Sequence, residues 1–351
     1  MNTSSKVSVV IPSYNHSKYI TQTISSVIRQ THKNIEIIVI DDGSSDNSCD
    51  LIRKISDPRI IFLEQNNQGA HAAINRGLSM ASGDFIAILN SDDIFTVNRI
   101  ETCVSYTSKL TNNCLICSYI EVIDSKDNPL GIKNGFANML PCNVDNPTNT
   151  FLSSNDPIEN LLMFNYVATT SNFFFNRSFI DKVGFFSNLR YVHDWDYLLR
   201  IAKDYPICII PEVLLKYRVH PTNTIKENHS RMILEICWIL AKNYPSILPS
   251  ITTKKSTDSD RFQFYERLYN SIQVYDCEKI LLNMMLIFFA CSNNPSLSDW
   301  DDILNPDHRL HQSLIEKIED IVAPRDGNKL ILKKSHETKL QTLKKILFGN
   351  Q

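Results

Sequence analysis

Residues 83–93 read GDFIAILNSDD, and this stretch decides the fold. The run Phe85–Leu89 has the length of a strand and is apolar at every position, which is typical of strands that a parallel sheet buries on both faces. It ends abruptly in the four polar residues 90–93, Asn-Ser-Asp-Asp. Because open α/β sheets bind ligands beyond the carboxyl ends of their strands, these four side chains are candidates for a binding site.

Two adjacent carboxylates, Asp92 and Asp93, carry the chemistry of this stretch. Buried together they repel each other and are costly to desolvate unless a cation joins them. A hard divalent ion, held by one or two carboxylates and by the phosphates of a substrate, offsets that cost. The alternative is that the acids only cap the following helix, which is common for Ser and Asp after a strand. The stretch alone leaves both interpretations open.

The composition limits the class of protein. The chain has 351 residues, of which 43% are hydrophobic and 21% charged, so it resembles a globular protein of one large or two smaller domains. Its net charge of −2 gives no indication of nucleic-acid binding. Nine scattered cysteines without paired zinc spacing predict buried thiols in a reducing compartment. The chain has a polar start without a signal peptide. Its longest apolar run, Ile280–Cys291, is broken only by Asn283 and is too short to span a bilayer, so we expect a cytoplasmic protein.

Strands and helices alternate in the first half of the chain. Short β-branched or apolar runs predict strands at Val7–Ile11, Ile35–Ile40 and Arg59–Leu63, before the strand at Phe85–Leu89. Apolar residues at helical spacing fill each gap between them. Strands that alternate with helices imply right-handed crossovers, so we expect an α/β fold with a mainly parallel sheet flanked by helices.

Three strand ends in this half are polar, at residues 13–15, 41–43 and 90–93. Because the carboxyl ends of parallel strands meet at one edge of a sheet, we expect these side chains to lie together. No Gly-x-Gly-x-x-Gly motif follows the first strand, which argues against a dinucleotide-binding domain, and there is no Gly-Lys-Ser/Thr motif. A metal, rather than a backbone cradle, is therefore expected to meet any phosphates.

Four segments together resemble the family 2 glycosyltransferases of the GT-A fold: VSVVIPSYN at 7–15, DDGSSD at 41–46, NNQG at 66–69 and LNSDD at 89–93. Their order and spacing match this family over about 90 residues. The resemblance implies a nucleoside-diphosphate sugar as donor, Mn²⁺ or Mg²⁺ as cofactor, and inversion at the anomeric carbon.

The sequence departs from the family pattern at two positions. Asn90 stands where many members carry the first Asp of an Asp-x-Asp motif, which weakens any role for position 90 as a metal ligand. Ile74 stands where many members carry an Arg, although the Asn75 and Gly77 of the same pattern are retained.

The resemblance also implies roles for particular residues. The segment YRVH at 217–220 is similar to the Tyr-Arg-x-His segment that closes many such domains. Metal ligands are then expected at Asp92, Asp93 and His220, with a structural role as the alternative for the histidine. Asp41 and Asp42 are expected to hold the base or ribose, and Arg218 to neutralise phosphate charge. The full set of expected donor-binding residues is Pro12, Tyr14, Asp41, Asp42, Asn67, Asn75, Asn90, Ser91, Asp92 and Arg218.

The segment HDWDYLLR at 193–200 resembles the family's Glu-Asp-x-Asp…Arg motif, in which an Asp is the catalytic base. Asp194 matches that position, and His193 stands where Glu or another polar residue is usual. The alternative for Asp194 is an acid placed at a helix N-terminus, where the macrodipole favours it. Asp196 is the rival for the role of base.

The rest of the chain is less informative. Residues 124–157 are rich in Asn, Pro and Asp and are expected to form a loop. After residue 224 the pattern becomes helical, with breaks expected near Pro245 and Pro249. We therefore expect a catalytic domain at 1–224 and an α-helical C-terminal domain at 225–351. Lys329–Lys345 carries six Lys and one Glu, which is typical either of a solvated helix or of peripheral contact with the cytoplasmic membrane face.

The resemblance implies an inverting glycosyltransferase that moves a sugar, with a UDP-sugar as the expected donor, to a hydroxyl of a glycan or lipid-linked acceptor. Asp194 would act as base in a metal-assisted single displacement. One alternative is a sugar nucleotidyltransferase, which needs a Gly- and Arg/Lys-rich loop after the first strand. The other is a non-catalytic scaffold that binds nucleotide sugars, which Asn90 leaves open.

Overall fold

The computed structural model describes residues 5–110, 113–133, 157–221, 223–224, 227–254, 257–271, 274–294 and 296–322. The basic segment Lys329–Lys345 and most of the expected loop at 124–157 lie outside these residues, as does Pro324, where the sequence predicts a further helix break.

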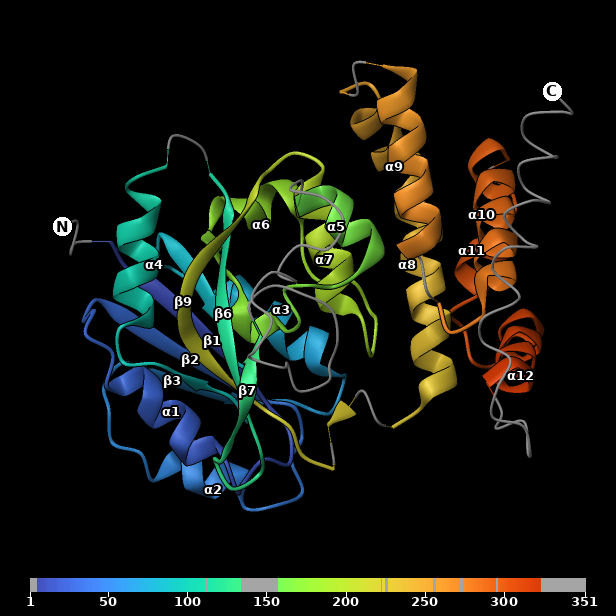
Figure 1. Cartoon of the computed structure of the whole chain (residues 1–351). Helices are drawn as coiled ribbons and strands as arrows, with labels where there is room; N and C mark the ends of the chain where they lie inside the picture. Colours follow the sequence, from blue (N-terminus) through green and yellow to red (C-terminus); the bar gives the residue numbers. More distant parts are fainter. Residues whose placement is uncertain are drawn as a thin grey trace, which may run out of the picture.

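The N-terminal half contains the four expected strands, joined by helices (Figure 1). The strands are β1 (Val7–Ser13), β2 (Ile35–Asp41), β3 (Ile60–Glu64) and β4 (Phe85–Ile88). The helices are α1 (Ile20–Ile28), α2 (Ser48–Arg53), α3 (Ala70–Met80) and, after β4, α4 (Arg99–Thr107). The pairings β1–β2, β1–β4 and β2–β3 are all parallel, as predicted for this half.

The second half completes the sheet with antiparallel and parallel strands. These are β5 (Ile94–Phe95), β6 (Leu115–Ile123), β7 (Pro129–Lys133), β8 (Phe174–Asn176) and β9 (Ile207–Arg218). The strand order is β3-β2-β1-β4-β8-β6-β9-β5, with β7 paired to β6. The pairs β4–β8 and β5–β9 are antiparallel, while β6–β9 is parallel, so the sheet is mixed beyond β4.

The central strands β1, β2 and β4 are buried on both faces, as their apolar sequences predict. Successive residues of β1 point to opposite faces. Val10 packs with α3, where Gly77 leaves room for it: a Cβ on Gly77 would lie 2.4 Å from Val10 Cγ1. Val9 and Ile11 belong to the other core, with α1 and α4.

The remaining helices follow the expected patterns except at two prolines. They are α5 (Pro157–Met163), α6 (Ser178–Val183), α7 (His193–Ala202), α8 (His229–Thr252), α9 (Asp258–Ser271), α10 (Glu278–Asn293), α11 (Asp299–Asp302) and α12 (Arg309–Val322), with a 3₁₀ turn η2 (Thr170–Asn172). The breaks predicted at Pro245 and Pro249 are wrong, because α8 continues through both. Proline in a helix interior costs about 3 kcal/mol, and the burial of Tyr244, Ile247 and Ile251 on α8 outweighs that local cost.

The loop predicted at 124–157 is also wrong in part. Pro129–Lys133 forms β7, a short strand that pairs antiparallel with β6. Its sequence, PLGIK, contains Pro and Gly, which disfavour strands. Pairing with β6, rather than local preference, makes this segment a strand.

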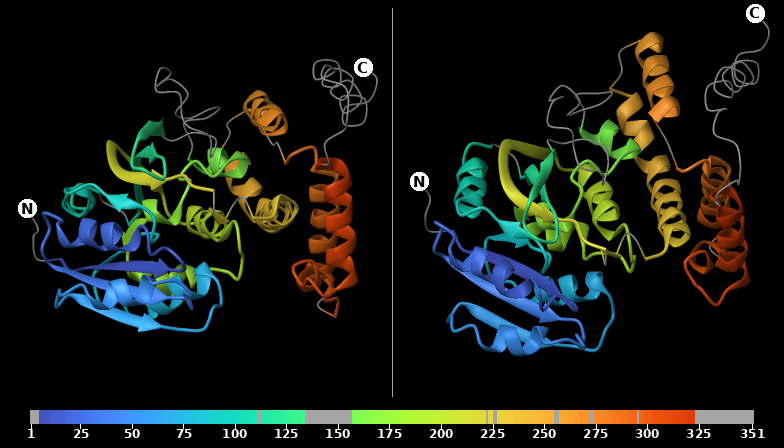
Figure 2. Two further views of the ribbon diagram at one scale, coloured as in Figure 1. Left: turned by 90° about the horizontal axis from the view of Figure 1, so that it is seen from below. Right: turned by 60° about the horizontal axis from the view of Figure 1, so that its bottom comes forward.

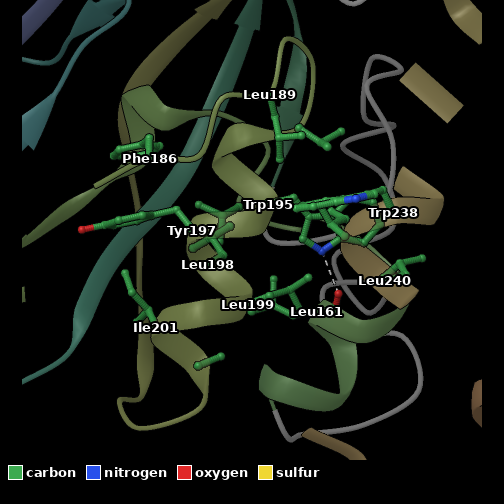
Figure 3. Close-up of a cluster of buried hydrophobic side chains, with 14 of the residues drawn as sticks. Leu161, Phe186, Leu189, Trp195, Tyr197, Leu198, Leu199, Ile201, Trp238 and Leu240 are labelled. Carbon is green, nitrogen blue, oxygen red and sulfur yellow. Dashed lines mark hydrogen bonds between the residues drawn. The ribbon is translucent and has the colours of Figure 1, made fainter. Parts of the chain in front are cut away.

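One hydrophobic core joins the sheet half to the C-terminal helices. Figure 3 shows side chains of α5, α7 and α8 packed together, with Trp195 Nε1 donating a hydrogen bond of 2.8 Å to the carbonyl of Leu161. Both views of Figure 2 place α8 (yellow) between the sheet half and the orange-to-red helices α10 and α12. The core cluster therefore crosses residue 224, and the division of the chain there stays a prediction. Within the described residues, no helix combines the length and apolarity needed to cross a bilayer.

Replacing Leu199 by Ala should lower the free energy of unfolding by about 2–5 kcal/mol, because it opens a cavity in the cluster of Figure 3. Urea unfolding followed by circular dichroism measures the change. Leu282 on α10 is the matched control, since its side chain is 57% exposed and Leu282→Ala should change the same free energy by no more than about 0.5 kcal/mol. Equal losses in the two variants would contradict the packing of α7 described above.

Candidate functional site

The carboxyl ends of β1, β2 and β4 meet at one edge of the sheet. Ser13 at the end of β1 pairs with Asp41 at the end of β2, and its Oγ donates a hydrogen bond of 3.0 Å to Oδ2 of that Asp. The segment after β4 is joined to the segment after β1, because Nδ1 of His16 lies 2.7 Å from Oγ of Ser91. The polar residues that follow the three strands are therefore neighbours.

Asp41 and Asp42 are buried and bonded within the protein. The carboxylate of Asp41 accepts hydrogen bonds from the backbone N–H and the hydroxyl of Ser44, at 2.8 and 2.7 Å. That of Asp42 accepts from the backbone N–H groups of Gln68 and Gly69, at 2.9 and 2.8 Å. The two acids thus fix the loops on either side of the edge, and their direct contact with a nucleotide stays a prediction.

Other expected donor-binding residues differ in accessibility. Tyr14 and Asn67 are exposed, whereas Pro12 and Ser91 are buried. Asn75 exchanges two hydrogen bonds of 2.9 Å with the backbone of Phe186, which ties α3 to the segment that precedes α7.

Asn90 is bonded to the turn η2 rather than to the neighbouring acids. Its Nδ2 donates to Thr169 Oγ1 at 3.1 Å, and its Oδ1 accepts from Thr170 Oγ1 at 2.9 Å. The amide therefore fits the space between β4 and η2. This agrees with the weakened expectation of a metal-ligand role at position 90.

Three side chains form a group that fits a divalent cation. The ligand atoms of His16, Asp92 and His220 all lie within 4.8 Å of one another. Nε2 of His220 is 2.9 Å from Oδ2 of Asp92, and the rings of the two histidines meet edge to face at 5.6 Å. Two imidazoles and one carboxylate suit Mn²⁺ better than Mg²⁺, which prefers oxygen ligands alone. His16 was not predicted, because a single His at the start of a helix carries no signal of its own.

The pKa values of the two acids after β4 are shifted in opposite directions. Burial alone would raise the pKa of Asp92, but the hydrogen bond with His220 and the charge of His16 lower it below the usual range. Burial and the neighbouring Asp92 together raise the pKa of Asp93 well above its usual range. Asp93, which the sequence also predicts as a metal ligand, lies outside the group of three. Its oxygens accept from Ser171 Oγ at 2.6 Å and from the backbone N–H of Arg218 at 2.9 Å.

Arg218 braces this arrangement from inside, with only 1% of its surface exposed. Its Nε donates to the carbonyl of Asp92 at 2.8 Å, and its terminal nitrogens bond the carboxylate of Asp127 and, at 3.0 Å, Oε1 of Gln22. The guanidinium also lies 4.6 Å from the centroid of the Tyr19 ring. One side chain thus joins the end of β9 to α1 and to the backbone after β4, and its expected contact with phosphate stays a prediction.

Asp194 lies in the first turn of α7 and is 9% exposed. Its Oδ2 accepts from Asn165 Nδ2 at 2.8 Å, its Oδ1 accepts from the backbone N–H of Trp195 at 2.7 Å, and burial raises its pKa to about 6. The pKa of Tyr217 is raised by burial and by the charges of Asp93, Asp92 and Asp194.

Asp196, the rival of Asp194, is fully buried. Its Oδ2 accepts a hydrogen bond of 2.7 Å from Ser187 Oγ and forms an ion pair of 2.9 Å with Nε of Arg200. Arg200 in turn donates to the carbonyls of Val183 and Phe185. These contacts give Asp196 a structural place between α6 and α7.

A mixed α/β sheet that gathers buried acids and histidines at the ends of its strands has the layout of a ligand-binding α/β domain. The chain belongs to glycosyl transferase family 2, whose family model matches residues 8–183, half of the chain.

Individual relatives match over part of their length. An uncharacterised glycosyltransferase of Rickettsia typhi is 31% identical over 221 residues, which are 62% of this chain and 65% of that protein. Glycosyltransferase GlyG of Streptococcus pneumoniae is 40% identical over 126 residues, 35% of this chain and 42% of GlyG. The chain thus matches less than two thirds of either relative.

Solved structures share the fold at low identity. TarS 1-349 of S. aureus, in complex with UDP, is 16% identical with a TM-score of 0.55 over 90% of both chains. The mannosyltransferase PcManGT from Pyrobaculum calidifontis, in complex with GDP-Man and Mn²⁺, is 14% identical with a TM-score of 0.52 over 90% of this chain and 86% of that one. The predicted GT-A fold with a helical C-terminal region is confirmed.

Arg218→Lys should lower the free energy of unfolding by about 1.5–3 kcal/mol, because an ammonium cannot reproduce the forked hydrogen bonds of the guanidinium. Chemical denaturation measures it. Lys216→Arg, two residues earlier on β9, alters only a surface ion pair with Glu121 and should stay within about 0.5 kcal/mol of the parent. If Arg218→Lys leaves the free energy of unfolding unchanged, the hydrogen bonds of Arg218 do not stabilise the site.

Proposed function

We propose that the protein is an inverting glycosyltransferase that moves a sugar from a nucleoside-diphosphate sugar, a UDP-sugar, to a hydroxyl of a glycan or lipid-linked saccharide. Membership of the family supports the class of reaction. The observation that carries the proposal is the group of His16, Asp92 and His220, which the ends of β1, β4 and β9 bring together. The charge of Asp194 acts on Tyr217, as do the charges of Asp92 and Asp93. Solved proteins of this fold include complexes with UDP and with GDP-Man and Mn²⁺, which agrees with the donor class.

His16, Asp92 and His220 would hold the cation, and Mn²⁺ fits this donor set. When bound, the ion supplies Lewis-acid stabilisation to the diphosphate that leaves the sugar. Asp93 and Arg218 serve this group indirectly, because they fix the backbone on which Asp92 stands. Asp41 and Asp42, through the loops they anchor, would shape the space for base and ribose.

Asp194 would accept the proton of the acceptor hydroxyl. As that oxygen forms its bond to the anomeric carbon, the bond from this carbon to the diphosphate oxygen breaks on the opposite face, and the electron pair leaves with the nucleoside diphosphate. A single displacement of this kind inverts the carbon. A carboxyl with a pKa near 6 is a stronger base than an exposed one and is still largely ionised at neutral pH.

A non-catalytic binding scaffold is the second candidate, and Asn90 is the observation that favours it. Its amide is bonded to η2, so this chain lacks the first acid of the usual metal motif. Tight donor binding without release of nucleoside diphosphate would support the scaffold. Release of pyrophosphate would instead indicate a nucleotidyltransferase. Peripheral membrane contact through Lys329–Lys345 remains part of the proposal for a lipid-linked acceptor.

Asp92→Ala should abolish the Mn²⁺-dependent thermal stabilisation of the protein by nucleotide sugars, because it removes the only carboxylate of the three-residue group. UDP-GlcNAc, UDP-glucose, UDP-galactose and GDP-mannose are screened with Mn²⁺ and with a chelator. A donor at 100 times its Kd should add about 2.7 kcal/mol of stability to the parent protein.

Titration of the protein with MnCl₂, without nucleotide sugar, measures the Mn²⁺ affinity of each variant directly. His16→Ala should weaken Mn²⁺ binding by at least about 10-fold. His308→Ala, which removes a half-exposed imidazole on another part of the chain, should leave it unchanged. If Asp92→Ala and His16→Ala both bind Mn²⁺ with unaltered affinity, these residues are not metal ligands.

Asp194→Asn should keep donor affinity and lower kcat by about 10²- to 10⁴-fold, the usual value of a general base. In the parent protein, kcat/KM should rise with pH through about 6, because Asp194 accepts a proton only when ionised. Nucleoside diphosphate release between pH 4.5 and 8 measures both. Asp196→Asn should mainly lower the melting temperature, since it breaks a buried ion pair. The reverse outcome, a kinetic loss in Asp196→Asn alone, would assign the base to Asp196.

A further inference from the structure

Glu235 is a buried carboxylate on α8 that points back to the segment before α7. It is 6% exposed. Its Oε1 accepts a hydrogen bond of 2.9 Å from the backbone N–H of Arg190, and its Oε2 accepts from those of Tyr191 and Val192, at 2.7 and 3.3 Å. Three consecutive N–H groups thus converge on one side chain from a helix that follows them in sequence by more than 40 residues.

Such a carboxylate is not needed for packing. In the described part of the chain no Lys or Arg side chain forms an ion pair with Glu235, although the charge of Arg231, one turn earlier on α8, acts on it. Burial of an unpaired acid is costly and raises its pKa, and the three charge-assisted hydrogen bonds offset that cost. An apolar residue would fill the same place without this cost but would leave the three donors unmet.

The bonded segment leads directly into Asp194. Val192 is the N-cap residue of α7 and its side chain makes no capping hydrogen bond, because valine has no acceptor. Without a side-chain cap, the start of α7 depends on backbone contacts, and residues 190–192 are held by Glu235. Arg190 adds a second tie, since its guanidinium forms a two-pronged ion pair with Glu227, just before α8.

We propose that Glu235 is a positioning residue for the transfer reaction: it fixes residues 190–192 so that α7 presents Asp194 to the acceptor hydroxyl. The inference rests on the proposed function, because it assigns Asp194 as the base. If Glu235 has this role, the C-terminal helical region contributes to the reaction through one hydrogen-bonded side chain of α8.

Tyr244 on the same helix provides a matched control. Its hydroxyl donates a hydrogen bond of 2.7 Å to the carbonyl of Leu162 on α5, so it also joins α8 to the sheet half, yet the structure records no hydrogen bond between it and the described residues 190–192. Tyr244→Phe removes this one bond, and Glu235→Gln keeps the shape of the side chain but places an amide N–H against N–H donors. Both variants should lower the melting temperature.

The first measurement is amide hydrogen exchange on the full chain without ligand. Glu235→Gln should speed exchange at Arg190, Tyr191 and Val192 and in the first turn of α7 by at least about 10-fold, whereas Tyr244→Phe should not. Unchanged exchange at these amides would overturn the inference. If Glu235→Gln does not fold, Glu235→Asp, which keeps the charge on a shorter side chain, takes its place in every comparison.

The second measurement is kinetic and uses the donor that gives the largest thermal shift in the screen above. Glu235→Gln should lower kcat by about 10- to 100-fold while the KM for donor stays within about 2-fold, because a displaced base affects the chemical step and not donor binding. Tyr244→Phe should leave kcat within about 2-fold of the parent. Equal kcat values in Glu235→Gln and Tyr244→Phe would show that Glu235 has a structural role only.

A double variant separates failure of this inference from failure of the proposed function. If Glu235 acts through Asp194, the combination of Glu235→Gln with Asp194→Asn should be no slower than Asp194→Asn alone. A further multiplicative loss in the double variant would show that Glu235 does not act through Asp194. Full activity of Asp194→Asn would instead contradict the assignment of the base, and hydrogen exchange would still decide whether Glu235 holds the segment.

Discussion

Two carboxylates, side by side at the end of β4 and almost out of contact with water, set the constraint on which the rest of the site depends. Like charges so close cannot both stay ionised without help, and the chain gives them different partners. Asp92 faces two histidines, which favour its charge, while Asp93 faces a hydroxyl and a backbone N–H. Asp92 is thus the acid of the candidate metal group, while Asp93 holds the backbone around it.

Much of this could be predicted from the sequence because the signals are local. An apolar run that stops in polar residues marks a buried strand and its functional end, and the strand–helix alternation of the first half fixes which ends share an edge. Asp41, Asp42 and Asp92 are predicted in this way as site residues, and the structure places them at one edge of the sheet. The mixed pairing of the second half was harder to predict, since β5 is only two residues long and both β5 and β8 owe their antiparallel direction to pairing with β9 and β4.

Other features have no local signal. His16 joins the site because the start of α1 lies over Ser91, which depends on the packing of α1 on the sheet. The two prolines of α8 suggest breaks, and only the buried face of that helix explains why it continues. Glu235 looks like one acid in an amphipathic helix until the fold brings residues 190–192 to it. In each case a contact distant in sequence overrides the local preference.

The pairing of β5 with β9 has a consequence for the order in which parts of the fold form during synthesis. Asp92 and His220 are 128 residues apart, and Asp93 and Arg218 are 125 apart, yet both pairs meet beside this short antiparallel contact. Contacts with such long loops carry a high entropic cost of closure and form late. On the ribosome, β1 to β4 emerge first and can pair among themselves, with the two acids still exposed at their edge. The last strand to arrive, β9, therefore completes the site, and a nascent chain gains its candidate metal group only after the whole sheet has been synthesised.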